Sequence, residues 1–281
     1  MNMKNETPED QPVKRILVML DPSAPGRRAL RAAAGIAADL QAELLGLLVE
    51  DMNLFRLASL PFTREINLFT GSKEDFPPSS LAQGLQAQAE RLRRNLAAAA
   101  QQRQVSWSFR VTRGEIVAEV MTVMPQVDIL IIGRPRQSLP SRLRLTSHDL
   151  GRRSGSQQER PKAAGHYPVM AYFNGSPSSL RGMDTAGLLA RDNGGSLRII
   201  LPLGNQPLLK ELEQQVLQWM RQRHLKARLI YLAEVTIEKV VHLVNREHGS
   251  ALVLGRDTFD LDQGSFSELL DLLPCPVVLV N

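Results

Sequence analysis

The chain has 281 residues and 43% of them are hydrophobic, which is enough for two domains of ordinary size, each with its own core. Its longest apolar runs span five to seven residues and its first dozen residues are polar, so we expect no membrane span or signal peptide and predict a cytoplasmic protein. The net charge of +5 is modest, which excludes a chain that is basic throughout in the manner of a general nucleic-acid binder.

The first half of the chain alternates short β-branched apolar runs, typical of strands, with longer Ala- and Leu-rich runs, typical of helices. Such alternation predicts parallel βαβ units. The run DILIIG lacks polar alternation, so we expect that strand to be buried within the sheet. The predicted strands are 15–20, 43–50, 105–111 and 128–133, and the predicted helices are the Ala-rich run after DPSAPG, 80–103 and 115–124.

A basic segment follows the first half. Between Arg134 and Lys162 eight basic residues stand against two acidic ones, so this segment carries +6 and the rest of the chain −1. The segment is rich in Ser, Arg, Gly and Pro and has no apolar periodicity, which predicts a loosely ordered linker over 134–166. It also contains no aromatic residues that could stack on bases, so we expect no nucleic-acid partner.

The second half repeats the order of the first. Its predicted elements are PVMAYF, LRGMDTAGLLARD, SLRIILPL, LLKELEQQVLQWMRQR, ARLIYL, TIEKVVHLVNRE, SALVLG and a final helix and strand. Cys275, the only cysteine, precedes the last strand, so no intrachain disulfide can form and a buried, inert thiol is expected. The five histidines show no metal-ligand spacing, and we assign no metal site.

We interpret the chain as an internal duplication. The first domain covers 13–133 and carries an insertion at 51–80, whereas the second, shorter domain covers 167–281. No separate fifth strand is found for the first copy, since PVMAYF must serve as the first strand of the second. The first domain must therefore lack its edge strand or borrow one.

Three sequence features resemble the universal stress protein family. They are a first strand that ends in Asp-x-Ser before an Ala-rich helix (ILVMLDPSAPGRRALRAAAGIA), the segment RGEIVAEVMTVMPQVDILIIGR, and the terminal GS…CPVVLV. Their order and their recurrence make the chain similar to tandem universal stress proteins. The resemblance implies two flavodoxin-like (adenine nucleotide alpha hydrolase-like) doubly wound α/β domains, packed as an internal pseudo-dimer.

The resemblance also implies a nucleotide site. In members that bind ATP, an acidic residue after the first strand contacts the adenosine, and a loop Gly-x2-Gly-x9-Gly-Ser/Thr holds the ribose and phosphates. Glycines let backbone N–H groups approach the phosphates, and the helix N-terminus adds the positive end of its dipole. Asp21, Ser23 and Gly133 are the corresponding residues of the first copy, but no glycine stands three residues after Gly133.

The second copy departs from the pattern at other positions. Its corresponding residues are Asn174, Ser176, Gly255, Gly264 and Ser265. Asn replaces the acid, the middle glycine is absent, and Gly264 follows Gly255 by nine residues where the family has thirteen.

The shortened loop of the second copy is acidic. Asp257, Asp260 and Asp262 lie in it and would repel phosphate unless a cation intervened. Ser265 and Glu268 also fit a capping box at the start of the last helix, which explains this serine without a ligand.

We predict a non-catalytic, stress-related regulatory or protein-interaction protein with degenerate nucleotide sites. The alternative is an ATP- or AMP-binding sensor whose occupancy controls partner binding, which would make ATP its cofactor. No Gly-x-Ser-x-Gly, Gly-x4-Gly-Lys-Ser/Thr or His-Glu-x2-His motif indicates catalytic residues.

The apolar segment 54–69 is either a lid on its own domain or a docking surface for an unknown protein partner. The sequence leaves open whether the chain forms a homodimer, and no membrane partner is expected.

Overall fold

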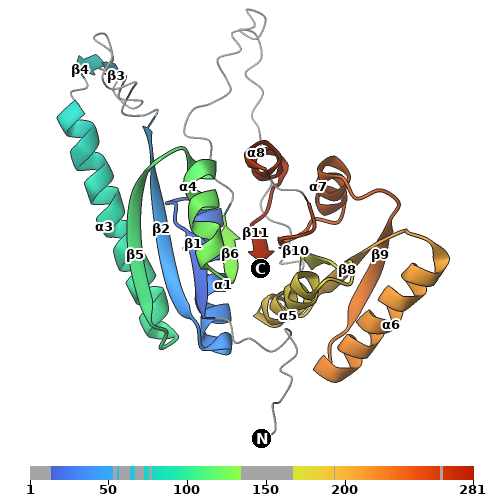
Figure 1. Cartoon of the computed structure of the whole chain (residues 1–281). Helices are drawn as coiled ribbons and strands as arrows, with labels where there is room; N and C mark the ends of the chain where they lie inside the picture. The colour runs from blue at the N-terminus through green and yellow to red at the C-terminus, as the bar shows by residue number, and fades with distance from the viewer. Residues whose placement is uncertain are drawn as a thin grey trace, which may run out of the picture.

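One sheet runs through both halves of the chain (Figure 1). The computed structural model describes residues 14–52, 56, 64–66, 73–75, 78–133, 167–192, 194–259 and 262–281. The strands of the sheet are β1 (Arg15–Met19), β2 (Glu43–Asp51), β5 (Trp107–Gly114), β6 (Ile129–Ile132), β7 (Val169–Tyr172), β8 (Leu197–Pro202), β9 (Ala227–Leu232), β10 (Ala251–Gly255) and β11 (Val277–Val280). Within the described residues they lie in the order β5-β2-β1-β6-β11-β10-β7-β8-β9.

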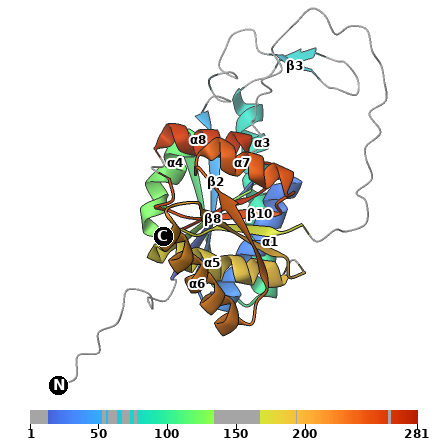
Figure 2. The ribbon, with the colours of Figure 1, turned by 90° about the vertical axis from the view of Figure 1, so that its right-hand side faces the viewer.

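Helices cover both faces of this sheet. They are α1 (Ala24–Leu40), α3 (Pro78–Gln102), α4 (Ile116–Val123), α5 (Pro177–Asp192), α6 (Gln206–Arg223), α7 (Ile237–Arg246) and α8 (Gln263–Leu272), with a 3₁₀ turn η2 (Met124–Gln126) after α4. The core between the sheet and α1, α3, α5 and α6 lies on one face, and the core under α4, α7 and α8 lies on the other. Figure 2 shows α4, α7 and α8 together on one side and α1, α5 and α6 on the opposite side. The predicted doubly wound α/β class is therefore confirmed.

The predicted elements of both halves are present and follow the same spatial order. The first half contributes β5-β2-β1-β6, and the second contributes its counterparts β9-β8-β7-β10. In both halves the central strands are fully buried, as the continuous apolar runs of β6 and β7 indicate. Of the insertion, the described residues include a short antiparallel pair, β3 (Arg64–Ile66) with β4 (Lys73–Asp75).

The two halves share a single fifth strand. β11 is parallel to β10, with Val253 opposite Val278, and antiparallel to β6, with Ile131 opposite Val278. Within the described residues the first half has no fifth strand of its own, so it borrows β11, as one of the two predicted alternatives required. Because β6 and β11 run in opposite directions, the carboxyl ends of the strands of one half meet the amino ends of the other half.

The buried position of Cys275 gives a first testable prediction. The thiol is 5% exposed, and burial raises its pKa from 9.0 to about 12. We expect a thiol reagent to leave the native protein unlabelled near pH 8 and to label it fully after unfolding in guanidinium, because only the thiolate reacts. The raised pKa also means that stability falls as the pH rises above 9 toward 12. Rapid labelling of the native protein would contradict this placement.

Of the described residues, none belongs to a helix long and apolar enough to cross a membrane. The predicted linker 134–166 lies outside the described residues. Of the predicted lid or docking segment 54–69, the structure describes only 56 and 64–66. These two predictions therefore stay predictions.

Candidate functional site

The first candidate crevice lies at the carboxyl end of β1. Asp21 follows this strand, and its Oδ1 accepts the backbone N–H of Ser23 at 2.6 Å. Ser23 is the N-cap of α1, and its hydroxyl accepts the N–H of Gly26 at 3.0 Å. The Asp-x-Ser signature thus builds the turn that starts α1, which places the Asp21 carboxylate beside the first helical turn.

Two glycines, Gly26 and Gly133, lie close to the Asp21 carboxylate. Gly133 follows β6, and a Cβ at this position would lie 2.9 Å from Gly26 Cα and 3.3 Å from Asp21 Oδ2. The structure therefore brings together the predicted residues Asp21, Ser23 and Gly133. Sequence reasoning missed Gly26, although its place three residues after the capping serine was a usable signal.

The Asp21 carboxylate has one oxygen without a hydrogen bond. Oδ2 is buried and finds no hydrogen-bond partner among the described residues. A buried oxygen of this kind is costly unless a donor reaches it. It could accept a hydrogen bond from a ligand hydroxyl or amine, whereas its negative charge would oppose a phosphate at the same place.

The second candidate crevice lies at the carboxyl end of β7 and repeats the same turn. Asn174 Oδ1 accepts the N–H of Ser176 at 3.0 Å, as Asp21 accepts that of Ser23. The Ser176 hydroxyl then accepts the N–H of Ser179 at 3.2 Å in the first turn of α5. Asn174 and Ser176 are thus brought together as predicted, but in a neutral version of the motif.

A carboxylate lies against the first turn of α5 in this crevice. The Ser178 hydroxyl donates a hydrogen bond to Asp257 Oδ1, although the two residues are 79 positions apart. A Cβ on Gly255 would lie 2.8 Å from the Ser179 nitrogen and 2.9 Å from Asp257 Oδ1. Burial raises the pKa of the Tyr172 phenol on β7, and the Asp257 charge raises it further. Asp257 therefore occupies the region where an anion would meet this helix N-terminus.

The structure does not bring Gly264 and Ser265 to this carboxylate. Among the described residues, a Cβ on Gly264 would approach only Asp262 Oδ1, 3.6 Å away. The prediction that Ser265 caps the last helix is wrong, because α8 begins at Gln263 and Asp262 is its N-cap. Asp262 Oδ1 accepts the Ser265 N–H at 2.7 Å, and this hydrogen bond lowers the pKa of Asp262. A carboxylate three residues earlier thus takes the capping role at the positive end of the helix.

The second crevice opens into a cleft between the two halves. The cleft has a volume of about 1300 Å³, and its polar lining includes Lys14, Asp128, Ser178, Arg256 and Asp257. Its first-half wall is the amino end of β1 and β6, which the antiparallel pairing of β6 with β11 brings to this side. The cleft therefore contains residues from both halves.

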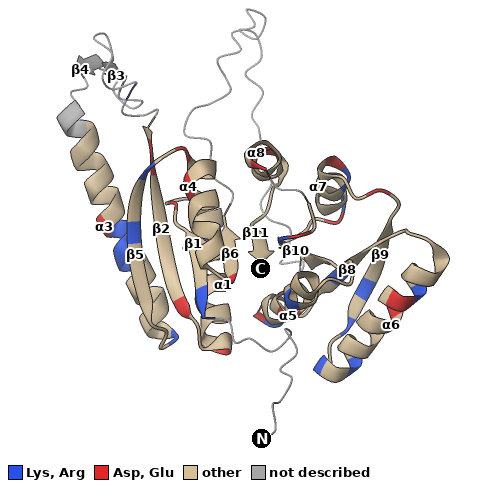
Figure 3. Ribbon diagram, viewed as in Figure 1, with Lys and Arg blue, Asp and Glu red and all other residues tan. Residues whose placement is uncertain are grey.

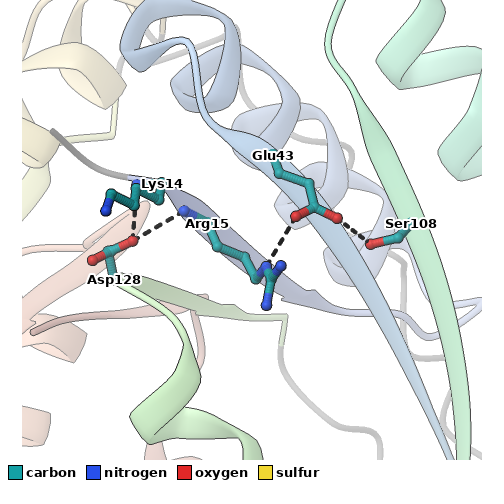
Figure 4. A network of polar contacts seen from close by, with 5 residues as sticks. All are labelled: Lys14, Arg15, Glu43, Ser108 and Asp128. Atoms are coloured by element: carbon teal, nitrogen blue, oxygen red, sulfur yellow. Dashed lines mark hydrogen bonds and ion pairs between the residues drawn. The ribbon is translucent and has the colours of Figure 1, made fainter.

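The polar groups of the first-half wall satisfy one another (Figure 4). Asp128 accepts the backbone N–H groups of Lys14 and Arg15 at 2.9 and 3.0 Å. Glu43 accepts from the Ser108 hydroxyl at 2.6 Å and from Arg15 Nε at 3.0 Å. The hydrogen bond from Ser108 and the contact with Arg15 lower the pKa of Glu43. This wall is built as a structural network, and the pKa of Glu43 is lowered, whereas a general acid typically has a raised pKa.

Within the part of the chain that the structure describes, no three His, Cys, Asp or Glu side chains are grouped as a metal site requires. The class defined by the fold is a doubly wound α/β protein with polar turns at the carboxyl ends of β1 and β7. Residues 12–150 match the family model described as "Universal stress protein family". The first half of the chain therefore carries a universal stress protein domain, as its sequence motifs predict.

Comparison with solved structures shows how far the fold extends. A universal stress protein from Archaeoglobus fulgidus DSM 4304 is 12% identical, covers 95% of this chain and 96% of its own, and gives a TM-score of 0.51. A putative universal stress protein from Pseudomonas aeruginosa UCBPP-PA14 is 12% identical over 95% of this chain and 93% of its own, with a TM-score of 0.44. A universal stress protein solved in complex with cAMP is 18% identical over 41% of this chain and 95% of its own, with a TM-score of 0.35.

No match to a curated protein is found. At these identities the likeness to the Archaeoglobus protein concerns the fold alone, and it extends over both halves of the chain.

Proposed function

We propose that this chain is a non-catalytic, stress-related regulatory or protein-interaction protein whose two nucleotide crevices are degenerate. The observation that carries the proposal is the contact of Asp257 with Ser178 at the first turn of α5. A fixed carboxylate at a helix N-terminus occupies the hydrogen-bond donors and compensates the positive end of the helix dipole, both of which would otherwise attract phosphate. Asp257 would repel the phosphates of ATP in this crevice unless a cation intervened.

The second candidate function is an ATP- or AMP-binding sensor that uses the first crevice. Its support is the buried Oδ2 of Asp21, which has no hydrogen-bond partner among the described residues. A ligand hydroxyl or amine would donate the missing hydrogen bond to this oxygen, as in family members whose acidic residue contacts the adenosine. The segment that would hold the phosphates lies after Gly133, outside the described residues. Asp21, Ser23 and Gly133 would then hold the nucleoside end.

Thermal unfolding with ATP, with and without Mg²⁺, separates the two candidates. We expect no dose-dependent rise in Tm at millimolar nucleotide. A ligand at a hundred times its Kd would add about 2.7 kcal/mol and raise Tm by several degrees. A rise that disappears in Asp21→Ala would overturn the proposal in favour of the sensor.

Removal of the blocking carboxylate gives a positive test of the same idea. In Asp257→Ala the Ser178 hydroxyl and the first turn of α5 lose their anion, so we expect phosphate to raise the Tm of this variant more than that of the wild type. Sodium chloride at matched ionic strength controls for screening, and Asp39→Ala, at an exposed aspartate of α1, controls for the loss of one charge. Equal phosphate responses of all three proteins would show that Asp257 does not block an anion site.

A further inference from the structure

The outer edge of the second half carries open backbone groups. Among the described residues β9 pairs only with β8, and it ends the sheet (Figure 1). The Leu203 N–H donates to the Leu232 carbonyl at 2.8 Å, so the backbone groups of Leu232 face β8. Because these groups alternate along a strand, those of Ala227, Leu229 and Tyr231 face away from the sheet. An edge of this kind can accept another strand.

One side of α6 borders this edge. The Tyr231 hydroxyl donates to Glu213 Oε1 at 2.7 Å, which fixes the Glu213 side of the helix next to β9. Leu217 and Arg221 follow at intervals of four residues and lie on the same side. Leu217 is 42% exposed and Tyr231 is 43% exposed. The edge thus presents apolar surface with an acid at one end of the stripe and a base at the other.

The charges of this stripe are arranged for pairing with a copy of itself. Figure 3 shows acidic residues along the middle of α6 and basic residues toward its C-terminal end. Arg221 forms no ion pair with a described residue. A two-fold axis through Leu217 would bring Glu213 opposite the partner's Arg221, and Arg221 opposite the partner's Glu213.

The strand and the helix agree on where this axis must pass. Leu229 precedes Tyr231 by two residues, a shift of about 6.6 Å along a strand. The same distance along a helix corresponds to about 4.4 residues. Because α6 runs opposite to β9, the level of Leu229 on the strand corresponds to the level of Leu217 on the helix, four residues after Glu213. Leu229 has outward-facing backbone groups and can therefore pair with its own copy across the axis.

We propose that a second copy of this chain docks on this edge, with the two β9 strands antiparallel and the two α6 helices side by side. Leu217, Leu229 and Tyr231 form the apolar centre, and Glu213 and Arg221 pair with the partner at the rim, as in ordinary interfaces. The proposal does not depend on either nucleotide crevice.

Sedimentation velocity on the full chain tests this interface. We expect the wild type to sediment with twice the 31.2 kDa chain mass at micromolar concentration. Leu217→Glu places two like charges at the axis and should raise the dimer dissociation constant by about a hundredfold. Leu208→Glu is the matched control, because Leu208 is 43% exposed but lies on the other side of α6, and it should stay dimeric.

A charge exchange identifies the register. Glu213→Arg and Arg221→Glu should each raise the dissociation constant about tenfold, and the double variant should restore much of the loss, since the pairing is reciprocal. Circular dichroism checks that every variant is folded. A monomeric wild type, a dimer that tolerates Leu217→Glu, or a double variant no better than the singles would each overturn the proposal.

Discussion

Replacement of Val278 by aspartate is expected to unfold both halves of the chain. Val278 is 1% exposed and lies in β11 between Ile131 of the first half and Val253 of the second. A carboxylate at this place would have no partner in the core, and the cost of burying it exceeds about 4 kcal/mol, a large part of the stability of an ordinary domain. Because β11 is the only described strand that β6 and β10 share, the loss should reach both halves together.

Urea unfolding followed by circular dichroism measures this effect. Val278→Asp should lack a cooperative transition or unfold at much lower urea, and the milder Val278→Ala should cost about 2 kcal/mol while it keeps one transition. Val111→Asp is the control, because Val111 is 42% exposed on the outer strand β5 and should change stability little. Two separate transitions in Val278→Asp, one with wild-type stability, would show that the halves do not depend on a common strand.

Local patterns in the sequence predicted the elements of this fold but not the seam between its halves. Buried runs such as ILVM in β1 and ILII in β6 predict central strands, because every residue in them is apolar and both faces of the strand are covered. The sharing of β11 depends on a pairing between Ile131 and Val278, which lie far apart in the sequence. The sequence of an apolar strand does not indicate which strand it pairs with. The sequence could therefore show only that the first half lacks a fifth strand of its own.

The local turns of the candidate site could be predicted from the sequence, but its long-range contacts could not. The Asp-x-Ser turn is local, and Asp21 and Ser23 lie where the motif places them. The sequence also marked Asp257 as an obstacle to phosphate, but not its contact with Ser178, which depends on the packing of α5 against β10. The sequence predicts the wrong N-cap for the last helix because Asp262 and Ser265 are both good N-caps, and the structure has Asp262 in this role.

Alanine at Gly133 is expected to destabilise the protein at the first crevice. The backbone of Gly133 has no positive φ, so an alanine would adopt it without strain. Its Cβ would nevertheless lie 2.9 Å from Gly26 Cα, a backbone atom that cannot turn away as a side chain could. Either β6 or the first turn of α1 must shift, at a cost of about 2 kcal/mol, and the Asp21 carboxylate must move with it.

Gly84→Ala makes the same substitution where the outcome should have the opposite sign. Gly84 lies inside α3, and a Cβ there meets no atom within 4 Å. Alanine should therefore stabilise the helix by about 0.5–1 kcal/mol, because it removes only the flexibility of glycine. Urea unfolding of both variants gives the two free energies, and equal values would mean that Gly133 does not approach α1 as closely as the structure shows. Opposite signs would establish the contact between β6 and α1 on which the first crevice depends.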